Sequence, residues 1–212
     1  MKDARYAKLV LMVNGLVPAA MLAWDGLVGP GLGANPVEFV LHTTGMLALI
    51  FLTLSLAVTP ARKISGINFL SNFRRMLGLF AFFYGVAHLI TYSIFNQGGS
   101  IRAIINDTIA HPYIALGMLA LLVMVPLAAT STNGAIKRMG AARWKRLHQL
   151  AYFAAACGVM HYWLLVKKDT RLPMVFAVAV AALLLYRVYD ALRPRPAKPA
   201  PAKRVIPLEP SA

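Results

Sequence analysis

The fold is decided by the stretch 74-RRMLGLFAFFYGVAHLITYSIF-95. Two arginines open it, and about twenty residues without a formal charge follow, enough for a helix to cross the hydrocarbon core of a bilayer. Such a run must be helical, because lipid offers backbone groups no hydrogen-bond partner. His88 interrupts the run, and an ionisable residue at this depth is costly unless it has a role. The stretch therefore indicates a transmembrane helix with a candidate functional histidine.

Comparable apolar runs occur along the rest of the chain. The protein has 212 residues, 59% of them hydrophobic, and a mean hydropathy of +0.64. None of the runs alternates apolar and polar residues as a membrane strand does. We therefore expect an all-α integral membrane protein, a bundle of about six transmembrane helices over residues 8–26, 39–58, 76–95, 112–129, 147–166 and 173–191. The first run, which follows three basic residues, also resembles a signal peptide.

Basic residues are distributed unevenly over the loops between these runs. Of the 22 lysines and arginines, 18 fall on one side of the predicted membrane. Basic loops face the cytoplasm, so both termini are predicted to be cytoplasmic, in a bacterial inner membrane. This placement accounts for the net charge of +15, and we expect no nucleic-acid partner. Residues 1–192 are predicted to form the membrane domain, and 193–212, rich in Pro and Lys, a disordered cytoplasmic tail.

Two histidines lie at matching depths in the predicted bundle. His88 follows Arg75 by 13 residues and His161 follows Arg146 by 15 residues, which puts them about 20 and 22 Å from the cytoplasmic edge. Two neutral imidazoles facing each other can fill both axial positions of a haem iron, which then carries electrons. Because Cys157 is the one cysteine, no Cys-x-x-Cys-His exists, and a haem b would be held non-covalently. The alternative is that each histidine is hydrogen-bonded inside the bundle.

An inner haem would need other residues. His148 lies near the cytoplasmic edge, and Arg74 is about 40° from the helix face of His88 at a similar depth. A guanidinium stays protonated, so Arg74 is expected to pair with a propionate rather than with iron. His148 and His161, 13 residues apart, share no face of an ideal helix, so a tighter turn between them is required. One haem or two therefore remains open, and an interfacial position is the alternative for His148.

The remaining histidines and the electron donor are less constrained. His42, at the outer edge, can bond a propionate, a quinone or the interface alone, and we expect His111 to be interfacial. Tyr84 and Tyr92 lie one turn either side of His88, where they can touch a macrocycle.

Because the chain has no Gly-x-Gly-x-x-Gly fingerprint, electrons would come from a lipid-soluble donor or a separate protein. A transporter or scaffold is an alternative that expects acidic partners within the spans, whereas the acids lie near span ends or in loops.

Several short motifs in a fixed order carry a resemblance to a known family. They are Gly31-Leu32-Gly33-Ala34-Asn35-Pro36-Val37, His42-Thr43-Thr44-Gly45, Thr59-Pro60, Arg74-Arg75-Met76-Leu77-Gly78 leading to His88, Pro112-Tyr113 with Gly117, Thr130-Ser131-Thr132, Trp144 with Leu147-His148, and His161-Tyr162. From about Gly31 to the end of the sixth run the chain resembles the MsrQ (YedZ) family, haem-binding membrane subunits within the ferric-reductase-like transmembrane superfamily.

The resemblance carries expectations about cofactors and partners. It implies haem b at His88 and His161, with His148 as a candidate inner ligand; larger relatives have a fourth histidine where this chain has Arg74 or Arg75. It also implies electrons from the quinone pool, FMN without a visible motif, and a periplasmic molybdopterin methionine sulfoxide reductase, MsrP, as partner. A cytochrome b subunit for a ferric reductase or a dehydrogenase is the alternative.

Overall fold

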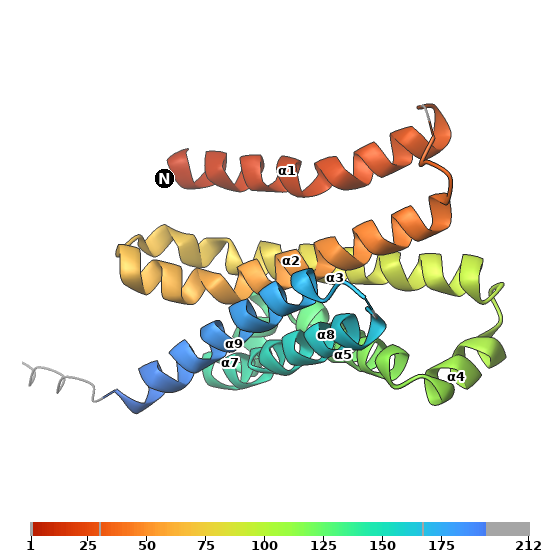
Figure 1. Cartoon of the computed structure of the whole chain (residues 1–212). Helices are drawn as coiled ribbons and strands as arrows, with labels where there is room; N and C mark the ends of the chain where they lie inside the picture. Colours follow the sequence, from red (N-terminus) through yellow and green to blue (C-terminus); the bar gives the residue numbers. More distant parts are fainter. Residues whose placement is uncertain (1, 30, 167, 194–212) are drawn as a thin grey trace, which may run out of the picture.

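The structure is a computed structural model that describes residues 2–29, 31–166 and 168–193. Within these ranges the chain is helical, with no β-strand, which confirms the predicted all-α class. The predicted tail lies outside the described residues from position 194 onward. Figure 1 shows long helices, some of them joined at their ends by shorter ones, whereas loops join α1 to α2 and α8 to α9.

Each predicted run corresponds to a long helix. These are α1 (Lys2–Leu27), α2 (Pro36–Ser65), α3 (Arg74–Thr91), α5 (Pro112–Ala129), α8 (Leu150–Leu165) and α9 (Arg171–Leu192). Shorter elements connect them: the 3₁₀ helix η1 (Asn68–Asn72), the π-helix η2 (Tyr92–Asn96), α4 (Ile101–Ala110), α6 (Asn133–Met139) and α7 (Ala141–His148).

Among the described residues, five helical stretches are long and apolar enough to cross a membrane: Arg5–Leu27, Pro36–Ser65, Asn68–Asn96, Pro112–Ala129 and Arg171–Leu192. The helix α8 has 16 residues, fewer than the roughly 20 that a perpendicular crossing takes. It continues α7 with Gln149 as the single residue between them. The number of six crossings therefore stays a prediction.

Two helix pairs form the centre of the molecule. We call α2 with α3 the first hairpin and α5 with α8 the second hairpin; the two helices of each pack along one another. In lipid, close packing rather than transfer from water holds helices together, and small residues allow it. Ala81, Ala154 and Ala155 are fully buried where the hairpins meet, beside a stack in which the Phe51 ring lies 5.2 Å from Phe80.

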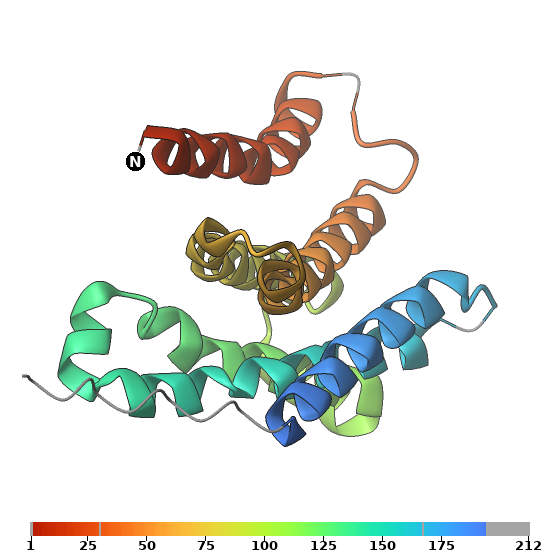
Figure 2. The same ribbon diagram turned by 90° about the vertical axis from the view of Figure 1, so that its left-hand side faces the viewer.

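The helix α1 lies apart from the second hairpin in both Figure 1 and Figure 2. It is joined to the first hairpin by Tyr84, whose hydroxyl donates to the Gly15 carbonyl (2.7 Å) and accepts from the Ala19 N–H (3.2 Å). The hydroxyl thus inserts between two groups that an unbroken helix would bond to each other, next to Pro18. Tyr84, one of the two tyrosines whose spacing from His88 allows contact with a macrocycle, anchors α1 and is not among the residues that line the cavity.

Candidate functional site

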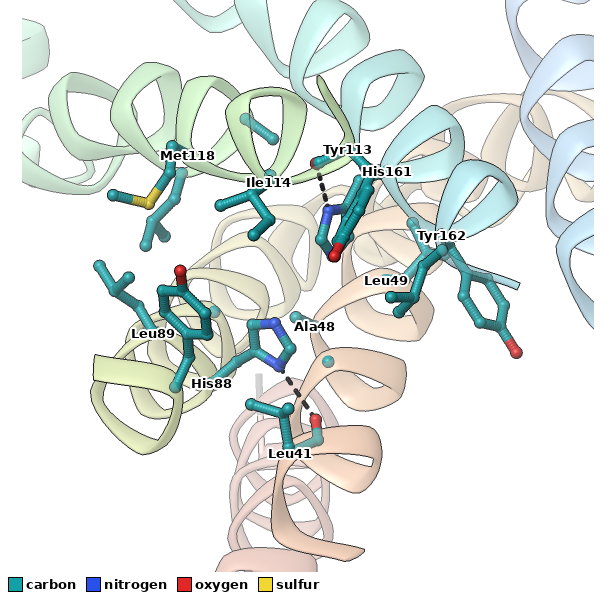
Figure 3. Close-up of a pocket in the computed structure, with 18 of the residues that line it drawn as sticks. Leu41, Ala48, Leu49, His88, Leu89, Tyr113, Ile114, Met118, His161 and Tyr162 are labelled. Atoms are coloured by element: carbon teal, nitrogen blue, oxygen red, sulfur yellow. Dashed lines mark hydrogen bonds between the residues drawn. The ribbon is translucent and has the colours of Figure 1, made fainter. Parts of the chain in front are cut away.

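His88 of α3 and His161 of α8 come together between the two hairpins. Their ring centres are 6.1 Å apart and their planes make an angle of 85°. Figure 3 shows both rings directed into one space. With metal–nitrogen bonds of about 2 Å and a ring centre about 1 Å behind each nitrogen, two imidazoles on opposite sides of one metal have centres about 6 Å apart. The observed separation matches that geometry.

Both rings are oriented by backbone carbonyls of the neighbouring helix. The Nδ1 atom of His88 lies 2.9 Å from the Leu41 carbonyl oxygen of α2, and that of His161 lies 2.6 Å from the Tyr113 carbonyl oxygen of α5 (Figure 3). A carbonyl can only accept, so each Nδ1 carries the hydrogen. In the neutral ring Nε2 then keeps its lone pair, and that is the nitrogen a metal takes.

A glycine lies beneath each ring. A Cβ on Gly45 would be 2.9 Å from Nδ1 of His88, and a Cβ on Gly117 would be 2.8 Å from Nδ1 of His161. Each glycine follows the carbonyl-bearing residue by four positions, one helical turn. The two hairpins therefore carry the same unit: a carbonyl, a glycine one turn on, and a histidine from the next long helix. Sequence reasoning missed this unit, although both glycines stand in the motifs quoted above.

The histidine pair lines a cavity of ≈ 450 Å³, with residues of α2, α3, α5 and α8 around it. This volume falls within the roughly 300–1,000 Å³ of cofactor pockets. Among the described residues no group of three or more His, Cys, Asp or Glu could hold a bare metal ion. Two axial imidazoles suffice when a macrocycle supplies the other ligands, so the site fits a haem in chemistry and in size.

The inner histidine has a different environment. His148 ends α7, its ring stacked 3.9 Å from that of Trp144, and its Nε2 lies 3.1 Å from the Thr130 hydroxyl. That hydroxyl donates to the Pro126 carbonyl at 2.6 Å. It therefore accepts from His148, whose Nε2 carries the hydrogen.

The turn between His148 and His161 is tightened, as their spacing required. The Gln149 N–H bonds to the Arg146 carbonyl and the Tyr152 N–H to the Gln149 carbonyl, each three residues back instead of four. As a result both histidines contact α5, one at Thr130 and the other at Tyr113.

Arg74 lies at the start of α3, within electrostatic reach of His148 and of Arg187 from α9. The structure thus brings together the two inner residues that the sequence singled out, although neither lines the cavity of His88 and His161. Arg187 donates to the Leu56 carbonyl (2.7 Å) and to the Tyr152 hydroxyl (2.9 Å). Arg187 was not predicted as a site residue, because basic residues near that end of the chain are also expected from the rule that cytoplasmic segments of membrane proteins are basic.

The other two histidines lie at the end of the bundle that the sequence predicts to face outward. His42 is exposed at the rim of the cavity, with Nε2 3.6 Å from the Glu38 carboxylate. His111, expected to be interfacial, is half-exposed, and its Nδ1 donates to Asp107 at 2.7 Å. Asp107 lines the cavity and had no distinguishing signal in the sequence.

Fold and site together define a helical membrane protein whose two hairpins each present one histidine to a shared cavity. The family described as "Ferric reductase like transmembrane component" matches residues 44–159, which include His88, all of α3 and α5, and most of α2 and α8. This match covers more than half of the chain.

Curated relatives narrow the assignment. A protein of Deinococcus radiodurans is 47% identical over 89% of this chain and 93% of its own length. One of Rhodospirillum rubrum is 45% identical over 93% and 95%, and one of Herminiimonas arsenicoxydans 43% identical over 89% and 87%. Each is named "Protein-methionine-sulfoxide reductase heme-binding subunit MsrQ". The chain belongs to the MsrQ family of ferric-reductase-like transmembrane proteins.

Proposed function

We propose that this protein is a haem b electron-transfer subunit of a bacterial inner membrane, with His88 and His161 as the axial ligands of an outer haem. The observation that carries the proposal is the 6.1 Å separation of two rings whose Nε2 atoms are left free. The relatives' printed name, a heme-binding subunit, agrees with it. A haem with both axial positions filled supplies one-electron transfer and no open site for oxygen chemistry.

The chain's own residues do three things for such a group. The carbonyls of Leu41 and Tyr113 hold each imidazole in the tautomer that leaves Nε2 to the metal. Gly45 and Gly117 let the rings lie against the neighbouring helices. The apolar residues in the lining, such as Leu49 and Met118, would lower the polarity around the group, which affects its redox potential.

His148 is proposed as the ligand of an inner haem, with Arg74 paired to a propionate. Arg74, His148 and Arg187 lie together at the basic end of the bundle, where carboxylates are attracted. Two haems would carry electrons from a cytoplasmic-side donor to the periplasm. For Nε2 of His148 to bind iron, it must release Thr130.

The donor is proposed to be the quinone pool or a flavin protein, and the acceptor a periplasmic molybdopterin methionine sulfoxide reductase, MsrP, that repairs oxidised proteins. The relatives' name supports a reductase partner of this kind. FMN is part of the proposal through family resemblance, and we assign no residue to it.

Both termini are proposed to be cytoplasmic, on the basis of the uneven basic residues. A reporter active only in the cytoplasm, fused after Ala212, should be active, and a periplasm-dependent reporter should be silent. Activity of the periplasmic reporter at this position would overturn the topology.

The test of the haem is an optical spectrum of the purified chain. A sharp Soret band, with split α and β bands on reduction, is expected from low-spin bis-histidine haem. A colourless protein, purified from cells with ample haem, would refute the proposed function. Electron transfer to the partner is then measured as methionine sulfoxide reduction by MsrP with and without the subunit.

A further inference from the structure

A polar cluster at the outer end of the cavity has no part in holding the histidine pair. Its centre is Asp107 of α4, whose carboxylate accepts hydrogen bonds from the Tyr92 hydroxyl, from Gln97 Nε2 (2.7 Å) and from His111 Nδ1 (2.7 Å). Tyr92, Gln97 and Asp107 all line the cavity, and His111 is half-exposed beside it. The cluster therefore connects the cavity with the outer surface.

The cluster lies one turn outward from the proposed ligand. Tyr92 follows His88 by four residues, about 6 Å along the helix and on the same face. At this point α3 passes into the π-helical turn Tyr92–Asn96, a feature that is frequent at functional sites. Tyr92, Asp107 and His88 line the same cavity, so a molecule bound at the cluster would share it with a group held by His88.

The helix α4 places the cluster at the lipid–water boundary. Ile101, Ile105 and Ile109, one turn apart from each other, are 73%, 52% and 80% exposed. Asp107 is about 200° around the helix from Ile105, so it faces the opposite way. An exposed apolar stripe opposite a polar one is typical of a helix that lies in the membrane interface. In Figure 1, α4 lies beyond the end of α3, at the start of α5.

The chemistry of the cluster selects a neutral hydroxyl donor. A carboxylate has about four acceptor positions and no hydrogen, and the three bonds described use three of them. Its charge repels a haem propionate but suits an O–H group. A ligand that reaches this point from lipid and gives up electrons through a hydroxyl is a quinol.

We propose that the Asp107 cluster is the binding site for the headgroup of a membrane quinol, with Asp107 accepting its hydroxyl protons and releasing them to the outer aqueous phase on the side of the half-exposed His111. This inference rests on the proposed function, which supplies the electron acceptor in the cavity. Oxidation of one quinol to quinone breaks two O–H bonds. Two protons leave through Asp107, and two electrons pass singly to the acceptor held by His88 and His161.

The test compares Asp107→Asn with Asp169→Asn in the full haem-loaded chain. Asp169 belongs to the loop before α9 and does not line the cavity, so its variant is the matched control. Binding of a short-chain ubiquinone analogue is measured by calorimetry, and reduction by its quinol is followed in the Soret band. For Asp107→Asn we expect binding and quinol-driven reduction to fall about tenfold or more, because a charged acceptor is lost. The haem spectrum and reduction by dithionite should be unchanged.

Wild-type quinone binding and quinol-driven reduction in Asp107→Asn with full haem content would overturn the proposal. If Asp107→Asn loses haem, the proposal is tested instead with Tyr92→Phe and His111→Gln. Each of these variants removes one hydrogen-bond partner of Asp107 and keeps the carboxylate. Both must then weaken quinol-driven reduction with haem retained, and wild-type rates in both would equally overturn the proposal. If the wild-type chain binds no haem, the proposed function is refuted. The calorimetric titration still tests quinone binding independently of haem.

Discussion

The first and second hairpins are alike at their outer ends and different at their inner ends. At the outer end each contributes a carbonyl, a glycine one turn on and a histidine whose Nδ1 is bonded to that carbonyl. Thirteen residues before its outer histidine, the second hairpin is preceded by His148 at the end of α7, whereas the first has Arg75 in α3. Arg75 turns away and donates to Asn133 of α6 at 2.7 Å, and its neighbour Arg74 lies near His148 instead.

This difference shows how the two ends can serve different purposes. Two equal units, one from each hairpin, suit a planar group with two equivalent axial positions. An inner end with one histidine and a guanidinium suits a group held by one axial bond and by charge. The Nε2 atoms reflect the same contrast, since they are free in the outer pair and occupied by Thr130 in His148.

Removal of either outer histidine should have the largest effect. We expect His88→Ala and His161→Ala each to lose the outer haem, because one hairpin then offers no axial ligand. Haem per protein and the reduced low-spin spectrum are the measurements. Asp169→Asn, in the loop before α9 and outside the cavity lining, is the control and should keep a wild-type spectrum. A wild-type spectrum in both ligand variants would show that the iron is bound elsewhere.

Removal of His148 should affect the inner end of the bundle and leave the outer haem in place. We expect His148→Ala to lower haem content by one per chain if the inner haem is present, to leave the outer spectrum largely intact, and to impair reduction from the cytoplasmic side. The measurements are haem per protein and the rate of flavin-driven reduction from the cytoplasmic side. If His148→Ala abolishes all haem while His161→Ala retains it, His88 pairs with His148 and the outer pairing is wrong.

The equivalence of the hairpins predicts equal effects of the two glycines. A methyl group on Gly45 or Gly117 would push the adjacent ring off its carbonyl, and loss of such support typically weakens metal binding about 10–100-fold. Haem dissociation rates of Gly45→Ala and Gly117→Ala check this. Gly78→Ala is the control, since a Cβ there meets no atom within 4 Å. Unequal losses would mean that one hairpin holds the group more firmly than the other.

The smallest effect is expected at Thr130. A Thr130→Val variant removes the acceptor of the His148 Nε2–H, and a hydrogen bond of this kind contributes about 1 kcal/mol. Inner haem affinity, measured by titration of the apoprotein, should then rise about fivefold. Unchanged affinity would indicate that the inner group does not use Nε2 of His148, and the outer spectrum serves as the internal control.

Much of this architecture follows from local features of the chain. The apolar run at 112–129 coincides with α5, and the other five runs fall on long helices with ends displaced by a few residues. The largest displacement is in α2, which extends to Ser65, because the helix continues through Pro60 and a basic last turn beyond the apolar run that was predicted to end at 58. The matching depths of His88 and His161 needed only the rise per residue of a helix and the basic residues as a reference.

Sequence by itself determined the helical class, the apolar runs that fall on long helices and the position of each histidine along its helix, because these depend on composition and on distance along one helix. Tertiary structure alone decided which nitrogen of each histidine is free, that Gly45 and Gly117 lie under the rings, and that Asp107 collects Tyr92, Gln97 and His111 at the cavity mouth. Those facts depend on the rotation of one helix against another. Packing of side chains from distant segments sets that rotation, and no spacing within a single run encodes it.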